Sequence, residues 1–213
     1  LDFFTMSKSE IRDLYKCKSR DKAISIIEGN KGLFDGVSLN GEDSNAALAH
    51  LLKLNIILVL DCAGITRGIA PLLQGYQGFD KDLKYKGVIL NNVASDRHEG
   101  KIINTINEFT KFKIIGSVHK NKQLNIIEKK LGLEPVFQNK NTNKVIKNIS
   151  SIVKSSIDIK CLLNKPIKAK KNMITKINTR YSKYSNLRIG IALDSAFGFY
   201  YPDDIEKIKS YGV

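Results

Sequence analysis

The sequence predicts an α/β fold with a mainly parallel sheet. Short aliphatic and β-branched runs recur along the 213 residues, and longer amphipathic segments lie between them. The first four runs begin roughly 25 to 33 residues apart, which is the spacing of a strand, a crossover helix and a parallel strand. The runs are apolar without alternation, as expected for strands that helices cover on both faces.

The individual elements follow from these patterns. The predicted strands are Ala23–Ile27, Ile56–Leu60, Gly87–Leu90, Lys113–Val118 and Arg188–Leu193. The predicted helices are Ser7–Lys16, Ser44–Lys53, Gly68–Phe79, Asp96–Phe109 and Leu124–Leu131. Ser7 and Glu10 form an S-x-x-E capping box, in which each side chain satisfies a free amide of the first helical turn.

Composition excludes several classes of protein. Hydrophobic residues make up 42% of the chain, enough for a packed core, and the longest apolar runs fall far short of the roughly 20 residues that cross a bilayer. The first residues show neither a basic leader nor a cleavage site. Cys17, Cys62 and Cys161 are widely spaced and form no C-x-x-C pair, which favours ordinary thiols in a reducing compartment. We therefore expect a cytoplasmic protein without a membrane partner.

Most of the net charge of +14 lies in one stretch, which we call the basic tract. Residues 138–188 hold thirteen Lys or Arg and one acid, a charge of +12, so the other 162 residues sum to +2. The basic tract could bind nucleic acid through phosphate contacts. Only Tyr181 and Tyr184 could stack on bases there, and no recognition signature is present, so we favour a solvated linker with a short helix.

The residues that follow the predicted strands are candidates for a site, because ligands of such sheets bind at the carboxyl ends of the strands. A glycine-rich loop with two carboxylates, Glu28 and Asp35, follows the first run, Asp61 follows the second, and Asn91 follows the third. Such a loop could carry Mg²⁺ and a phosphorylated group, or it could be a polar turn.

Other signatures of catalysis are missing from the sequence. Neither G-x-x-x-x-G-K-[ST] nor G-x-G-x-x-G occurs, so no complete phosphate cradle is encoded. No Ser-His-Asp or Cys-His set can be assembled, and we interpret His50, His98 and His119 as packed or solvated side chains.

Six motifs in order resemble the cobyrinic acid a,c-diamide synthase family, the glutamine-dependent amidating enzymes of cobalamin biosynthesis. The resemblance covers nearly the whole chain. It is carried by EGNKGLFDG at 28–36, GEDSNAALAHLL at 41–52, LVLDCAGITRGIAPLLQGYQGFD at 58–80, GVILNNVASDRHEGKI at 87–102, KKLGLEP at 129–135 and ALDSAFGFYYPDDIE at 192–206.

The resemblance implies a ligase with two domains. The amino-terminal synthetase domain would be of the P-loop-NTPase or dethiobiotin-synthetase type, and a class I glutamine amidotransferase domain would follow it. The synthetase would use ATP and Mg²⁺ to phosphorylate the a- and c-acetate carboxylates of cobyrinic acid, and L-glutamine would supply the ammonia that forms each amide. The same chemistry on hydrogenobyrinic acid or nickel sirohydrochlorin, or less readily in cobyric acid formation, is an alternative. A regulatory ATPase with the same nucleotide fold is disfavoured by the AFGFYYP motif.

The resemblance also assigns roles to individual residues. Glu28 would hold Mg²⁺ near the ATP phosphates, and Asp35 would act next to the carboxylate being activated. Asn91 would hydrogen-bond the adenine edge. Asp61 and Arg67 would line the site, and the S-x-R-H run at 95–98 could place an arginine near phosphate or substrate.

The expected domain organisation has three parts. Residues 1–137 would be the synthetase domain without its first strand and P-loop, 138–186 the basic linker, and 187–213 the start of the amidotransferase domain. The absence of an initial methionine and the end at Val213 lead us to expect a fragment, inactive by itself. The expected partners are the corrin-ring carboxylate substrate, ATP and L-glutamine, nucleic acid is disfavoured, and a homodimer stays open.

Overall fold

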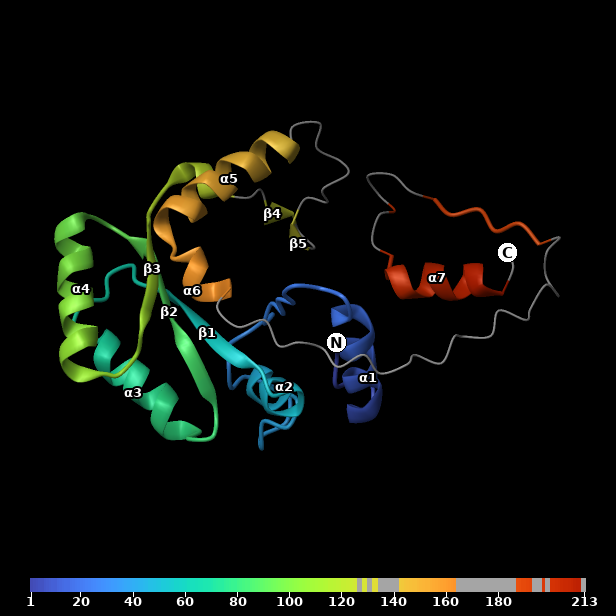
Figure 1. Ribbon diagram of the computed structural model, residues 1–213, viewed down its shortest axis with the longest axis horizontal. Coiled ribbons are helices and arrows are strands. Elements are labelled where there is room, and N and C mark those ends of the chain that lie inside the picture. The colour runs from blue at the N-terminus through green and yellow to red at the C-terminus, as the bar shows by residue number, and fades with distance from the viewer. Residues whose placement is uncertain are drawn as a thin grey trace. The chain divides into compact units, whose positions relative to one another are not determined.

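Three parallel strands form the centre of the first part of the chain (Figure 1). The computed structural model describes residues 1–125, 128–129, 132–133, 142–163, 187–192, 197 and 200–211. The sheet has the order β1-β2-β3, with β1 at Asn55–Asp61, β2 at Lys84–Val93 and β3 at Ile114–His119. These strands confirm three predicted runs, and each is longer than its run or shifted by one residue.

Four helices precede or separate the strands. They are α1 (Lys8–Ser19), α2 (Asn45–Leu52), α3 (Ile69–Phe79) and α4 (Asp96–Phe109), all close to the predicted ranges. The predicted capping box at the start of α1 is present, with the Ser7 hydroxyl accepting from the amide of Glu10. Ser44 caps α2 and Ser95 caps α4 in the same manner, because a side-chain oxygen satisfies an amide that the first turn leaves free.

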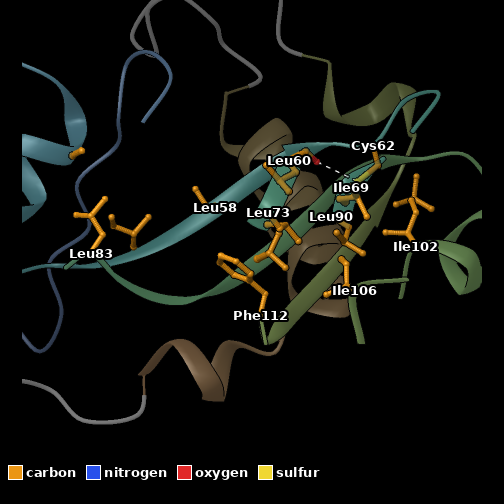
Figure 2. Close-up of a cluster of buried hydrophobic side chains, with 14 of the residues drawn as sticks. Leu58, Leu60, Cys62, Ile69, Leu73, Leu83, Leu90, Ile102, Ile106 and Phe112 are labelled. Atoms are coloured by element: carbon orange, nitrogen blue, oxygen red, sulfur yellow. Dashed lines mark hydrogen bonds between the residues drawn. The ribbon is translucent and has the colours of Figure 1, made fainter. Parts of the chain in front are cut away.

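The core lies between the sheet and the helices that cover one of its faces. Figure 2 shows strand residues such as Leu58, Leu60 and Leu90 packed against Ile69 and Leu73 of α3. Side chains from α4 and from the loop before β3 complete this cluster: Ile102, Ile106 and Phe112. The other face is covered over β2 and β3 only, since Ile57 and Val59 of β1 are exposed.

Two helices lie within the basic tract, α5 (Thr142–Ser156) and α6 (Ile159–Leu163), and the residues that join them border β3. Ile157, between them, forms an antiparallel bridge with Gly116, and the amide of Asp158 donates to the carbonyl of Ile115 at 2.9 Å. Cys161 of α6 is buried, so this part of the basic tract packs on the sheet and is more than a solvated linker.

The chain forms two compact units. The first comprises Leu1–Gln123 and Ile149–Lys171, and the second comprises Leu124–Asn148 and Asn172–Val213. Within the second unit, β4 (Glu128–Lys129) and β5 (Gly132–Leu133) form an antiparallel pair, and α7 spans Pro202–Ser210. In the described part of the chain, no helix has the length and apolar character to span a membrane.

Three predicted elements are wrong. Residues 23–27 are coil, with Ile26 84% exposed, because no strand pairs with them among the described residues. The predicted helix 124–131 is replaced by the end of a 3₁₀ turn, Lys122–Leu124, and by β4. Residues 188–192 are also coil, while Leu193 lies outside the described residues. Most of the KKLGLEP motif and part of the AFGFYYP motif lie outside them too.

Candidate functional site

A small polar cluster occupies the carboxyl ends of β1 and β2. Asp61 ends β1, and its carboxylate accepts from the Ala63 amide at 3.0 Å and from the side-chain amide of Asn92 at 3.1 Å. These two donors lower the pKa of Asp61, the Ala63 amide contributing most. Asn92 has a φ of 58°, a left-handed conformation that asparagine tolerates better than most residues. The cluster is therefore held in one arrangement by its own hydrogen bonds.

His98 joins the loops that follow β1 and β2. Its Nδ1 accepts from the Ala94 amide at 3.1 Å, so its Nε2 carries a hydrogen and donates to the carbonyl oxygen of Ile65 at 2.6 Å. The predicted packed histidine is confirmed, and the bonds give it a positioning role that the sequence pattern did not indicate.

Asn91 lies beside this cluster. It pairs with Asp61 across the two strands, and its carbonyl oxygen accepts from the Cys62 amide at 2.8 Å. The residue is half-buried near the carboxyl end of β2, the edge of a parallel sheet at which ligands commonly bind.

The loop that carries Glu28 and Asp35, which we call the acidic loop, comprises residues 28–43 and is organised around the start of α2. The side-chain amide of Asn45 donates to the carbonyl of Lys31 at 2.8 Å, and the Asp43 carboxylate accepts from the amides of Val37 and Ser38. These two backbone donors lower the pKa of Asp43. Asp43, which the sequence did not single out, is therefore the carboxylate that shapes this loop.

Glu28 and Asp35 are both exposed, and the structure corrects where their loop lies. No strand precedes it, and Phe34 packs on Phe79 with ring centroids 4.7 Å apart, in the last turn of α3. The hydroxyl of Tyr85 at the start of β2 donates to the carbonyl of Tyr76 in the same part of α3. Phe34 thus lies toward the amino end of β2. Residues 23–27 form no paired strand that would carry the loop to the carboxyl end of the sheet, so aromatic packing and the hydrogen bonds to the start of α2 place it.

Glu28 and Asp35 do not form a three-ligand metal site with another described side chain. Among the described residues, neither Glu28 nor Asp35 belongs to a group of three metal-ligating side chains. Both are exposed carboxylates, oxygen donors of the kind that Mg²⁺ prefers, and Mg²⁺ is commonly held by one or two carboxylates together with substrate phosphates. The residues therefore fit a magnesium ion that a nucleotide brings with it.

Arg67 lies just before α3, beside the last residue of α4. Its guanidinium stands 5.3 Å from the ring centroid of Phe109, a cation–π contact, and both residues line a cavity of about 410 Å³ between α3 and α4. The contact holds Arg67 between these helices.

Residues 4–127 match a protein family described as an AAA domain. The match covers more than half of the chain and includes all three strands of the parallel sheet. The chain belongs to this family. An AAA domain with a parallel sheet is consistent with the predicted P-loop-like α/β fold.

The AAA domain also resembles curated proteins named cobyrinate a,c-diamide synthase. The chain is 31% identical over 212 residues to that of Caldanaerobacter subterraneus, 32% over 219 residues to that of Magnetococcus marinus and 34% over 218 residues to that of Picrophilus torridus. All of the chain is aligned in each case, and it spans about half the length of these relatives, 46%, 47% and 48%. No solved structure matches the chain.

Proposed function

We propose that this chain is the synthetase part of an enzyme that amidates the a- and c-acetate carboxylates of cobyrinic acid, using ATP and L-glutamine. The observation that carries the proposal is the similarity along the whole chain to several proteins named cobyrinate a,c-diamide synthase from different organisms. Membership in the AAA domain family supports ATP as the co-substrate.

The chemistry requires activation of the substrate. A carboxylate is a poor electrophile, so a carboxylate oxygen attacks the γ-phosphorus of ATP and ADP leaves. Ammonia from glutamine then attacks the carbonyl carbon of the acyl phosphate. The carbon–oxygen bond to phosphate breaks, and inorganic phosphate departs with one oxygen that belonged to the carboxylate. Positioned charges stabilise the developing negative charge in both steps.

Glu28 and Asp35 have separate proposed roles. Glu28 would hold Mg²⁺ at the ATP phosphates, where the metal neutralises negative charge during transfer. Asp35 would act next to the carboxylate being activated, where its oxygens can accept hydrogen bonds from the incoming ammonia. The support is that both side chains are exposed and that the loop carrying them is fixed to α2 by Asn45 and Asp43.

Asn91 would bind adenine. A side-chain amide offers a donor and an acceptor together, which matches N7 and N6 of adenine. The support is its half-buried position near the carboxyl end of β2, beside the ordered pair of Asp61 and Asn92. Among the described residues, no hydrogen bond links Asn91 to the acidic loop. The proposal therefore requires Asn91 to bind the adenine and Glu28 to bind the phosphate-bound Mg²⁺ of the same nucleotide.

The remaining parts of the enzyme would lie in other segments. We propose that residues 1–137 act as the synthetase domain and that 187–213 begin the amidotransferase domain, with 138–186 between them. The P-loop and the glutaminase cysteine would lie outside the 213 residues, in a cytoplasmic protein.

The test is amidation by the intact enzyme. Cobyrinic acid, hydrogenobyrinic acid and nickel sirohydrochlorin are each incubated with ATP, Mg²⁺ and glutamine, and the product masses are measured for replacement of hydroxyl by amine. We expect a diamide from cobyrinic acid. A diamide from one of the other two only would keep the chemistry and change the substrate, while no amidated tetrapyrrole at all would overturn the proposal.

Asp35 is tested by substitution in the same enzyme. Asp35→Asn is expected to lower the amidation rate at least about 100-fold, a loss typical for a group that acts at the reacting atoms, with little change in ATP affinity. The matched control is Asp13→Asn, at an exposed acid of α1, which should leave the rate unchanged. Undiminished amidation by Asp35→Asn would remove Asp35 from the site.

A further inference from the structure

Two carboxylates and one imidazole meet where α4 begins and β3 ends. Asp96 and Glu99 stand three residues apart in the first turn of α4, so both project from the same face of the helix. His119 is the last residue of β3. Its Nε2 lies 2.7 Å from a carboxylate oxygen of Glu99, and its Nδ1 lies 3.9 Å from one of Asp96.

The donor atoms of these residues are close enough to share an ion. One ligand atom from each lies within 4.8 Å of the other two, and no other such group of His, Cys, Asp or Glu occurs in the part of the chain that the structure describes. Bonds of about 2.0–2.2 Å to a common ion require the donors to move somewhat closer. The Asp96 side chain is fully exposed and can change rotamer to do so.

A second observation points to a ligand at the same place. Glu99, Ser117 and His119 line a cavity of about 420 Å³, and the Ser117 hydroxyl oxygen is buried without a hydrogen bond of good geometry in the described residues. The bond with His119 lowers the pKa of Glu99, and the Ser117 hydroxyl contributes to that lowering, so this hydroxyl faces the cluster. A buried hydroxyl that faces the cluster without a well-formed hydrogen bond can donate to a water bound there.

We propose that Asp96, Glu99 and His119 bind a divalent transition metal ion of the Zn²⁺ class. Three protein ligands leave positions for water, and the Ser117 hydroxyl would hydrogen-bond one such water. The imidazole selects Zn²⁺ or Co²⁺ over Mg²⁺ and Ca²⁺, which prefer oxygen ligands only. This site is separate from the magnesium proposed at Glu28 and does not depend on the proposed amidation.

The amino-terminal end of α4 weakly disfavours the binding of a cation at this site. The positive end of the α4 dipole is worth about 0.3–1 kcal/mol against a nearby positive charge. Two carboxylates in direct contact with the ion carry full negative charges and outweigh it. The ligands also come from a helix and a strand end that share the main core, which holds their backbones in place.

The experiment titrates the full chain with Co²⁺ and follows its visible absorption, then adds Zn²⁺ as a competitor. We expect one Co²⁺ per chain, displaced by Zn²⁺ and not by Mg²⁺. His119→Gln and Glu99→Gln should each weaken binding by at least about tenfold. Asp96→Asn changes a fully exposed side chain, so it tests the site even if the other variants fold poorly.

The matched control is His50→Gln. His50 forms the same kind of pair, with Nε2 at 2.8 Å from a carboxylate oxygen of Asp80, but no third ligand joins that pair among the described residues. Its loss should leave Co²⁺ binding unchanged. If the wild-type chain binds no Co²⁺, or if Asp96→Asn and His119→Gln both bind it as the wild type does, the cluster is an ion pair only and the proposal fails.

Discussion

Gly87 allows β2 to pack closely against β3. A Cβ at this position would collide with the backbone carbonyl oxygen of Lys113 and with the side chain of Ile115, so no larger residue fits between the strands. The register of β1 against β2 shifts directly before Gly87 pairs with Ile57. A close approach of this kind is a common reason for a glycine within a strand.

Replacement of this glycine should destabilise the sheet. Gly87→Ala is expected to lower the free energy of unfolding by about 1–3 kcal/mol, because β3 must move away from the new methyl group. Gly75→Ala is the control, since nothing lies within 4 Å of a Cβ there and alanine suits the interior of α3, which should gain about 0.5–1 kcal/mol. Denaturant unfolding measures both, and equal effects would contradict this account.

Asp43 makes the order of the acidic loop depend on pH. Backbone donors lower its pKa below 3.8 in the folded state, so its contribution to stability is complete above that value and is lost as the pH falls through the lowered pKa. Asp43→Asn should therefore be less stable than the wild type at neutral pH, and the difference should vanish in acid. Unfolding curves at several pH values measure it. A difference that persists unchanged below the pKa of Asp43 would show that its charge is not what matters.

At the scale of elements, α3 is held to the sheet by one face. Leu73 is 0% exposed and packs in the main cluster, while its neighbour Leu72 is 40% exposed. Leu73→Ala should cost about 2–5 kcal/mol through lost burial and a cavity, and Leu72→Ala should cost well under half as much. Thermal or denaturant unfolding measures both. Similar losses at the two positions would mean that α3 does not pack as the structure has it.

Three of the helices that the sequence predicted correctly carry their own start signal. Ser7, Ser44 and Ser95 cap α1, α2 and α4, and α4 begins and ends at the predicted residues. The run at 23–27 has strand residues but no partner strand among those described, and strand propensity depends on such a partner. The basic tract was read from charge alone, which cannot show that Ile157 bridges Gly116.

The candidate site was predictable in part. Asp61 and Asn91 follow strands of the sheet, and the structure places them together at its carboxyl end. The cluster of Asp96, Glu99 and His119 could not be found in the sequence, because the distance from 99 to 119 along the chain hides a contact that depends on how β3 lies against α4. The i, i+3 pair of acids was the only local signal.

On the scale of the whole molecule, most of the net charge lies outside the AAA domain along the sequence. The net charge of +14 is carried mostly by the basic tract, whereas the AAA domain at 4–127 holds the parallel sheet and the proposed nucleotide contacts. The chain spans about half the length of its curated relatives, so the proposed ligase would join this domain to further parts in one enzyme.

The most direct measurement follows an oxygen atom through the reaction. Cobyrinic acid labelled with ¹⁸O in its carboxylates is given to the intact enzyme with ATP and glutamine, and the inorganic phosphate is analysed by mass. An acyl phosphate must deliver one labelled oxygen to phosphate for every amide formed, and Asp35→Asn should lower the formation of both products together, by at least about 100-fold. Amide formation accompanied by unlabelled phosphate would contradict the account.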